Sequence, residues 1–268
     1  RLKKGPRMPS MIRLEVDNDA AVATVTLDNP AKRNALDAQA LRDLDRAYAE
    51  AETAGVRALV LRGEGRSFCS GRDISQVDAA TDDVSGYLDG LLAPLMRRMS
   101  AFPAPTFAAV QGACLGVGLG LLVASDVVYV ADDAKFGSPF AALGAALDSG
   151  GHSLFVERLG AHRTLDLIYT GRFMSGAEAV ASGLFSRSMP PDELLPTTMD
   201  AASTAARGPT AAFVGSKNLI ARMREERLAG WDALAAENAV QLELRETADF
   251  REGFTAFQEH RTPEFLGR

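Results

Sequence analysis

The sequence has few cysteines and no long apolar segment, and each shortage excludes a class of protein. Its 268 residues include two cysteines, Cys69 and Cys114, which are too few for a disulfide framework. No apolar run is long enough to span a bilayer, and no secretory signal pattern is visible. We therefore expect a reducing, cytoplasmic location and no membrane partner.

The patterns that bind nucleotides and nucleic acids are missing too. The formal net charge of −6 argues against a protein that binds the phosphate backbone of a nucleic acid. The dinucleotide fingerprint G-x-G-x-x-G fails because Leu121 stands three residues after Gly118. The phosphate-binding pattern G-x-x-x-x-G-K-[ST] does not occur, and no side chains stand at metal-ligand spacing. We expect no nucleic-acid partner, no cofactor and no metal.

One stretch is unusually rich in glycine and links a strand to a helix. The apolar residues Phe107–Val110 and the apolar run Leu119–Ala124 flank or overlap glycines at positions 112, 116, 118 and 120. The first N–H groups of such a helix lack intrahelical partners, so they can bind an anion or an oxygen that becomes negative during a reaction. A tightly packed helix start without a ligand explains the glycines equally well.

Hydrophobic spacing predicts a β/α body followed by helices. Alternating residues predict strands over Ile12–Asp17 and Val22–Leu27, and Asp37 is placed to cap the helix that follows. A further strand over Asp126–Ala131 alternates with helices, which is typical of βαβ units. From His152 onward the patterns are helical only.

These patterns divide the chain into three parts. Residues 1–10 read as a basic tail or an expression remnant, residues 11–205 as the β/α core, and residues 206–268 as a helical oligomerisation region. The helices beyond Trp231 carry more apolar side chains than an isolated tail should expose, so we expect contact with another subunit. Residues 78–90, which we call the flap, are acidic and without pattern, which predicts a loose surface segment.

Several motifs in order resemble the crotonase superfamily, the enoyl-CoA hydratase/isomerase family. The matching segments are LDNPAKRNAL, GRSFCSGRDIS, AVQGACLGVGLGLLVASDVVYVADDAKFGSPFAALG, MSGAEAVASGLF and DFREGFTAFQEHRTPEF. The resemblance implies an α/β fold in which residues 11–205 form a ββα spiral that binds acyl-CoA. It also implies a helical trimerisation region, and hence a homotrimer or a hexamer.

The resemblance assigns a role to two backbone N–H groups. Members of the family hold the thioester carbonyl of acyl-CoA between two such donors, which by motif position belong to Arg72 and Val117. Removing a proton beside the thioester places negative charge on the carbonyl oxygen, and each donor can stabilise this oxyanion by roughly 3–4 kcal/mol. For the Arg72 side chain we expect either solvation or contact with a CoA phosphate.

The resemblance also shows that the two glutamates of the hydratases are missing. Gly120 and Phe140 stand at their positions, and with Leu143 they are implied to line the acyl pocket. Asp148 stands where many hydratases have glycine, as in the 1,2-epoxyphenylacetyl-CoA isomerases of phenylacetate breakdown. One carboxylate is enough to shift a double bond, because it can take a proton from C2 and return it at C4. Capping of the next helix is the alternative role of Asp148.

The resemblance thus favours an enoyl-CoA isomerase in which Asp148 is the acid and base. A hydratase, another lyase or hydrolase of the family, and a non-catalytic acyl-CoA-binding member remain open. If Asp148 only caps a helix, the flap around Asp82 and Asp83 is the next place to seek a base.

Contacts with CoA are implied for a longer set of residues. Lys32 and Arg33 suit its phosphates, and Asp73 is as well explained as a helix cap. Phe257 and Arg261 are placed to reach the adenine pocket of a neighbouring subunit. The whole implied set is Lys32, Arg33, Ser70, Gly71, Asp73, Ile74, Gly116, Phe257 and Arg261.

Overall fold

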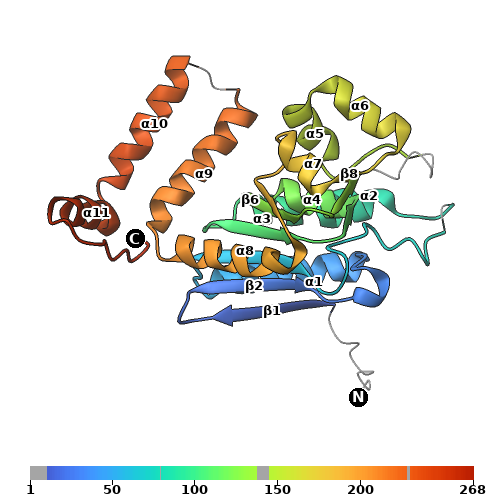
Figure 1. Cartoon of the computed structure of the whole chain (residues 1–268), viewed down its shortest axis with the longest axis horizontal. Helices are drawn as coiled ribbons and strands as arrows, with labels where there is room; N and C mark the ends of the chain where they lie inside the picture. The colour runs from blue at the N-terminus through green and yellow to red at the C-terminus, as the bar shows by residue number, and fades with distance from the viewer. Residues whose placement is uncertain (1–10, 79, 138–144, 228–229) are drawn as a thin grey trace.

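The computed structural model describes residues 11–78, 80–137, 145–227 and 230–268 (Figure 1). A six-stranded sheet forms the centre of the molecule. Its strands, in spatial order, are β1 (Ile12–Asp17), β2 (Val22–Leu27), β3 (Ala58–Gly63), β4 (Thr106–Val110), β6 (Val127–Ala131) and β9 (Arg187–Met189). Strand β1 is antiparallel to β2, and each later neighbouring pair is parallel. Parallel neighbours need crossover connections, which the helices supply.

Helices cover both faces of this sheet, because alternate residues of each strand point to opposite sides. Leu59 and Leu61 of β3 belong to the main core, together with residues of α1 (Ala38–Thr53). Val60, between them, packs in a second cluster with residues of α8 (Pro191–Ala206). The predicted cap of α1 is confirmed, since the Asp37 carboxylate accepts the Ala40 N–H at 2.7 Å.

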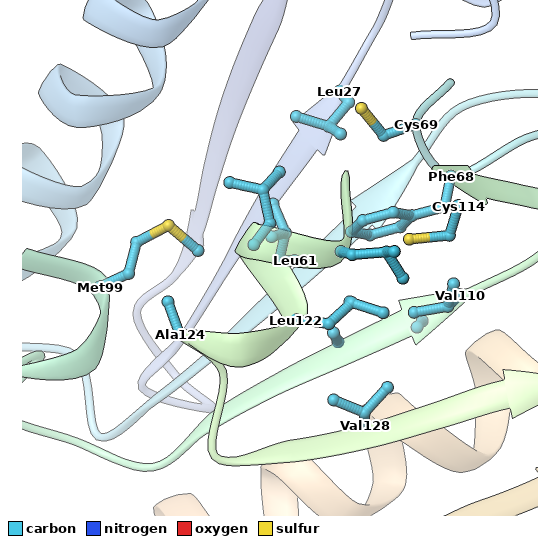
Figure 2. Close-up of a cluster of buried hydrophobic side chains, with 14 of the residues drawn as sticks. Leu27, Leu61, Phe68, Cys69, Met99, Val110, Cys114, Leu122, Ala124 and Val128 are labelled. Atoms are coloured by element: carbon cyan, nitrogen blue, oxygen red, sulfur yellow. The ribbon is translucent and has the colours of Figure 1, made fainter. Parts of the chain in front are cut away.

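A smaller sheet and a set of short helices lie above the main sheet in Figure 1. Its strands are β5 (Ala113–Leu115), β7 (Lys135–Gly137) and β8 (Met174–Ser175). The neighbouring helices are α3 (Ala93–Ser100), α4 (Val117–Val123), α5 (Gly151–Leu159), α6 (Ala161–Thr170) and α7 (Gly176–Ala181). Figure 2 shows Leu122 and Ala124, at the end of α4, in one cluster with Leu61 and Val128 of the main sheet. The glycine-rich stretch is therefore part of the main core.

The flap is more ordered than its sequence suggests, and the prediction of a patternless loop is wrong for its second half. Asp83 caps α2 (Val84–Tyr87) by accepting the Gly86 N–H at 2.8 Å. A π-helical turn over Leu88–Leu92 continues directly from α2. Tyr87 is buried, and its ring fixes this segment against the core.

Three helices at the C-terminal end lie away from the main sheet, on the left of Figure 1. They are α9 (Thr210–Glu225), α10 (Gly230–Leu244) and α11 (Ala248–Gln258). Arg57, just before β3, donates hydrogen bonds to Thr210 Oγ1 and to the carbonyl oxygens of Gly208 and Phe265. The buried Asp249 carboxylate accepts the N–H groups of Leu266 and Gly267 at 2.6 and 2.7 Å. Polar contacts thus fasten the final segment to the start of α9 and α11.

In the part of the chain that the structure describes, no helix combines the length and the apolar character that crossing a membrane requires.

We expect Asp249→Ala to lower the free energy of unfolding by about 1–3 kcal/mol, because two N–H groups lose a charged acceptor. Hydrogen exchange at Leu266 and Gly267 should become faster, while exchange in the main sheet should stay slow. Glu243→Ala, at an exposed position of α10, is the control and should change stability by less than about 0.5 kcal/mol. Equal stability of the two variants in urea unfolding would contradict the role of Asp249.

Candidate active site

Two segments far apart in the sequence run side by side and form the centre of the site. The Cys69 N–H donates to the Ala113 carbonyl at 3.1 Å, and the Leu115 N–H donates to the Cys69 carbonyl at 3.0 Å. Gly71 has φ +104°, and a Cβ there would lie 3.2 Å from the Leu115 carbonyl oxygen. Residues 69–72 and 113–117 are thus held close enough for their backbones to act on one ligand.

Each segment presents one backbone N–H without a partner. The Gly71 carbonyl and the Asp73 N–H both bond to Leu36, so the N–H of Arg72, between them, faces the other side of the segment. Val117 is the first residue of α4, and no side chain caps this helix. Among the described residues, neither the Arg72 N–H nor the Val117 N–H has an acceptor.

The Arg72 side chain is held by the flap. Its guanidinium donates to both carboxylate oxygens of Asp82, at 2.5 and 2.8 Å, and lies 4.2 Å from the ring centroid of Tyr87. The Tyr87 hydroxyl in turn donates to the Leu36 carbonyl at 2.8 Å. The hydrogen bonds that Arg72 donates to Asp82 raise the pKa of its guanidinium. The expectation of a solvated guanidinium is therefore wrong, because a carboxylate of this chain already pairs with it. Contact of Arg72 with a CoA phosphate stays a prediction.

Asp148 is half-buried and follows the residues that the structure leaves undescribed. Its carboxylate accepts the Ser149 hydroxyl at 2.6 Å. Ser149 and Gly150 both adopt left-handed backbone angles, with φ +55° and +77°. The Asp148 charge also raises the pKa values of Arg72 and Tyr87, although burial is the largest cause for Tyr87 and Asp82 is for Arg72. Asp148 is therefore near enough to Arg72 and Tyr87 for its charge to act on both.

Asp148 does not cap helix α5. The capping position is Gly150, and no side chain makes a capping hydrogen bond there. Only the backbone carbonyl of Asp148 accepts a helix N–H, that of Gly151, at 2.9 Å. Among the described residues, the Asp148 carboxylate accepts a hydrogen bond from the Ser149 hydroxyl and none from the start of α5, so the capping interpretation is wrong.

Gly120 has no space for a side chain, because the turn after Asp148 packs against it. A Cβ at this position would lie 2.7 Å from the Ser149 carbonyl oxygen, 2.8 Å from Ser149 Cβ and 3.4 Å from Met96 Sδ. The turn at 148–150 and a side chain at position 120 therefore exclude each other.

Lys32 and Asp73 form an ion pair at 2.6 Å beside the site. Asp73 also accepts the backbone N–H and the hydroxyl of Ser75, and these contacts with Lys32 and Ser75 lower its pKa to about 2. No helix follows Asp73, so the helix-cap interpretation of this residue is wrong. The Ser70 N–H donates to the Arg33 carbonyl at 2.9 Å, so the backbone of residues 32–33 runs beside the loop that contains Ser70.

Two of the predicted site residues lie elsewhere. Phe257 is 82% exposed, and Arg261 is paired with Glu252 and Glu259. Both residues belong to the α11 region, which lies at the opposite end of the molecule from α2 in Figure 1. Phe140 and Leu143 fall outside the described residues. Ile74 is 50% exposed, and Gly116 precedes α4 with φ +53°.

Sequence reasoning missed Tyr87, and it named Asp82 only as an alternative base, not as the partner of Arg72. Both lie in the flap, whose acidic composition gives no sign of contacts with Arg72. The one available signal was Asp83, because a helix that it caps brings Tyr87 round to the inner face.

Cys69 and Cys114 lie beside the two unpaired N–H groups but are buried and free. Burial raises the pKa of the Cys69 thiol to about 12 and that of Cys114 well above its usual value. Both are neutral side chains that fill space below the site. Within the described ranges, His, Cys, Asp and Glu side chains form no group of three that could hold a metal ion.

The sequence model of a family described as "Enoyl-CoA hydratase/isomerase" matches residues 17–268. The chain belongs to this family. A similar relative from Rhodobacter capsulatus, "Probable enoyl-CoA hydratase", is 35% identical over 96% of this chain and 98% of its own. The "2,3-dehydroadipyl-CoA hydratase" of Escherichia coli is 32% identical over 96% of this chain and 100% of its own.

Solved structures of the enoyl-CoA hydratase/isomerase family have the same fold. An enoyl-CoA hydratase from Mycobacterium smegmatis has a TM-score of 0.86 and 27% identity, over 96% of this chain and 99% of that one. An enoyl-CoA hydratase from Bacillus anthracis has a TM-score of 0.87 and 26% identity, over 96% and 100%. The predicted α/β crotonase fold with a helical C-terminal region is confirmed.

We expect Gly120→Ala to destabilise the protein by about 1–3 kcal/mol, because its Cβ would overlap the Ser149 backbone. Alanine otherwise stabilises a helix by up to about 1 kcal/mol relative to glycine. Gly90→Ala is the matched control, since the nearest atom to its Cβ would be 4.0 Å away. Urea unfolding of both variants tests this, and a Gly120→Ala protein as stable as Gly90→Ala would contradict the packing at position 120.

Proposed function

We propose that this family member is an enoyl-CoA isomerase that uses Asp148 as its single acid and base. The observation that supports this best is the packing at Gly120, which leaves no room for a carboxylate on α4 and sets the Asp148 turn in that place. A carboxylate from the turn and one from α4 are mutually exclusive. We infer a reaction that needs one carboxylate, as in the phenylacetate-type isomerases.

In the proposed reaction, the thioester carbonyl of acyl-CoA accepts the N–H groups of Arg72 and Val117. Asp148 removes a proton from C2, and the electron pair left on carbon delocalises onto the carbonyl oxygen as an enolate. The two N–H donors stabilise that charge without having to reorganise. Asp148 then returns its proton at C4, so the double bond moves and no atom is gained or lost.

The same enolate could open a ring epoxide on the adjacent carbon. Its electron pair would form a carbon–carbon double bond as the carbon–oxygen bond breaks, and Asp148 would return its proton to the released oxygen. The proposed chemistry uses side-chain and backbone groups alone, without a metal or a prosthetic group. We propose that Lys32, Arg33, Ser70, Gly71, Asp73, Ile74 and Gly116 hold the CoA portion, although Lys32 must then exchange or share its contact with Asp73. A cytoplasmic location also stays a prediction.

The similarity to relatives that are named hydratases favours a second candidate, an enoyl-CoA hydratase. Mass spectrometry separates the two after incubation with a panel of 2-enoyl- and 3-enoyl-CoA thioesters. Isomerisation leaves the mass unchanged and changes retention, whereas hydration adds one water. Release of free CoA would identify a hydrolase, and an unchanged panel with measurable binding would identify a non-catalytic member.

We expect Asp148→Asn to lower kcat by about 10²–10⁴-fold, because asparagine cannot take up the proton. Folding and acyl-CoA binding should survive, since the asparagine oxygen can still accept the Ser149 hydroxyl. Exchange of the C2 proton with deuterated solvent should stop as well. Asp133→Asn removes the same charge at an exposed position and is the control. Full turnover of Asp148→Asn would remove this residue from the mechanism.

We also propose that residues 206–268 form an oligomerisation region and that the protein is a trimer or a hexamer. A groove of about 730 Å³ lies among α9, α10 and α11, far from the unpaired N–H groups of the site. Large apolar side chains remain exposed on these helices: Ile220, Leu242, Phe254 and Phe257. A partner subunit would cover this apolar surface. In such an assembly Phe257 and Arg261 would reach a neighbouring site.

Light scattering at micromolar concentration should give three or six times the mass of the chain. We expect Phe254→Glu to shift the protein toward monomers, because a charge would then enter the apolar surface. Phe254→Leu keeps that surface apolar and should leave the mass unchanged. A wild-type protein that is monomeric under these conditions would exclude the proposed assembly.

A further inference from the structure

Arg72 places a charged pair beside the acyl site. Its backbone N–H faces the space in front of Val117, while its guanidinium reaches across Tyr87 to Asp82. Asp148 acts on the same guanidinium from another segment. The guanidinium is therefore paired with Asp82 and lies within electrostatic reach of a second carboxylate, that of Asp148.

The pair is largely withdrawn from water. The exposed fractions of the Arg72 and Asp82 side chains are 21% and 15%, and the Tyr87 ring beneath them is 5% exposed. Bidentate pairs between arginine and carboxylate are among the strongest charge-assisted contacts. Opening such a pair leaves a partly buried charge without a partner, which is strongly unfavourable. The charge of Arg72 is thus already satisfied before any ligand enters.

We propose that the Arg72–Asp82 pair makes this site selective for acyl groups with an uncharged far end. The inference rests on the proposed function, because a carbonyl held by the N–H groups of Arg72 and Val117 brings the acyl chain beside the Arg72 side chain. An acyl chain that ends in a carboxylate would have to displace Asp82 from Arg72. It would also meet Asp148 as a like charge. A neutral chain meets neither obstacle.

The test measures the binding of saturated thioesters, which cannot undergo the proposed reaction. Hexanoyl-CoA and the monothioester adipyl-CoA have the same chain length, but only the second ends in a carboxylate. Calorimetry on the full-length wild-type protein should show that hexanoyl-CoA binds at least about tenfold more tightly, a difference of about 1.4 kcal/mol. Succinyl-CoA and suberyl-CoA, against butyryl-CoA and octanoyl-CoA, extend the comparison to shorter and longer chains.

Asp82→Asn should strengthen the binding of adipyl-CoA at least about tenfold, because it leaves Arg72 free to pair with the ligand. Asp89→Asn removes the same charge from the same flap, at an exposed position that contacts only Ser85 among the described residues, and should change nothing. The double variant Arg72→Gln with Asp82→Asn keeps the backbone N–H and should lose the gain. This last comparison shows that the gain comes from the guanidinium.

Two results would overturn the proposed selectivity for uncharged acyl groups. One is a wild-type protein that binds adipyl-CoA as tightly as hexanoyl-CoA, and the other is an Asp82→Asn protein with an unchanged affinity ratio. If circular dichroism shows that Asp82→Asn does not fold, Arg72→Gln replaces it. That variant leaves both carboxylates unopposed, so it should weaken adipyl-CoA binding further, and an unchanged ratio would again overturn the proposal. Equal binding of both ligands leaves the proposed isomerase intact, whereas binding of neither overturns both proposals.

Discussion

The close approach of two backbone segments is the constraint on which the site depends. Residues 69–72 and 113–117 touch along their length because glycine stands wherever a side chain would separate them. A Cβ on Gly118 would lie 3.0 Å from the Cys69 carbonyl oxygen, and one on Gly71 would crowd Leu115. The two unpaired N–H groups face one space only while this contact is kept. Buried thiols and leucines around α4 then hold the contact from below (Figure 2).

The second organising feature is electrostatic and connects the site to its surroundings. Arg72 belongs to one of the close segments, and its side chain ties the flap to it through Asp82 and Tyr87. The backbone and the side chain of Arg72 therefore have different roles. The backbone carries an N–H without an acceptor among the described residues, and the side chain holds the flap.

The sequence predicts regular elements well and contacts across loops poorly. Alternation identifies Ile12–Asp17 and Val22–Leu27, and a polar residue before an amphipathic run identifies the cap at Asp37; the structure confirms all three. The strand β9 was missed because it has three residues, too few for a pattern. The Arg72–Asp82 pair was missed because nothing in local spacing shows which of several flap acids turns inward.

Asp148 and Asp73 show the same limit, because for them a local pattern predicts a contact that does not form. Both fit the sequence rule for a helix cap, and neither caps a helix. Ser149 takes a left-handed conformation that is uncommon for a residue with a side chain, and its hydroxyl donates to the Asp148 carboxylate. Asp73 instead bonds Ser75 and Lys32. In both cases a tertiary contact overrides a local preference, and one sequence alone does not contain that information.

The mutual exclusion of a side chain at Gly120 and the turn at 148–150 has an evolutionary consequence. A lineage that keeps its carboxylate on α4 and one that keeps it on the turn cannot be connected by a single viable replacement at either place. Introducing glutamate at position 120 first would break the turn, and remodelling the turn first would leave the site without its aspartate. Passage between the two arrangements therefore requires coupled changes or an intermediate with neither carboxylate. The packing around one glycine thus separates two placements of a carboxylate within the same fold.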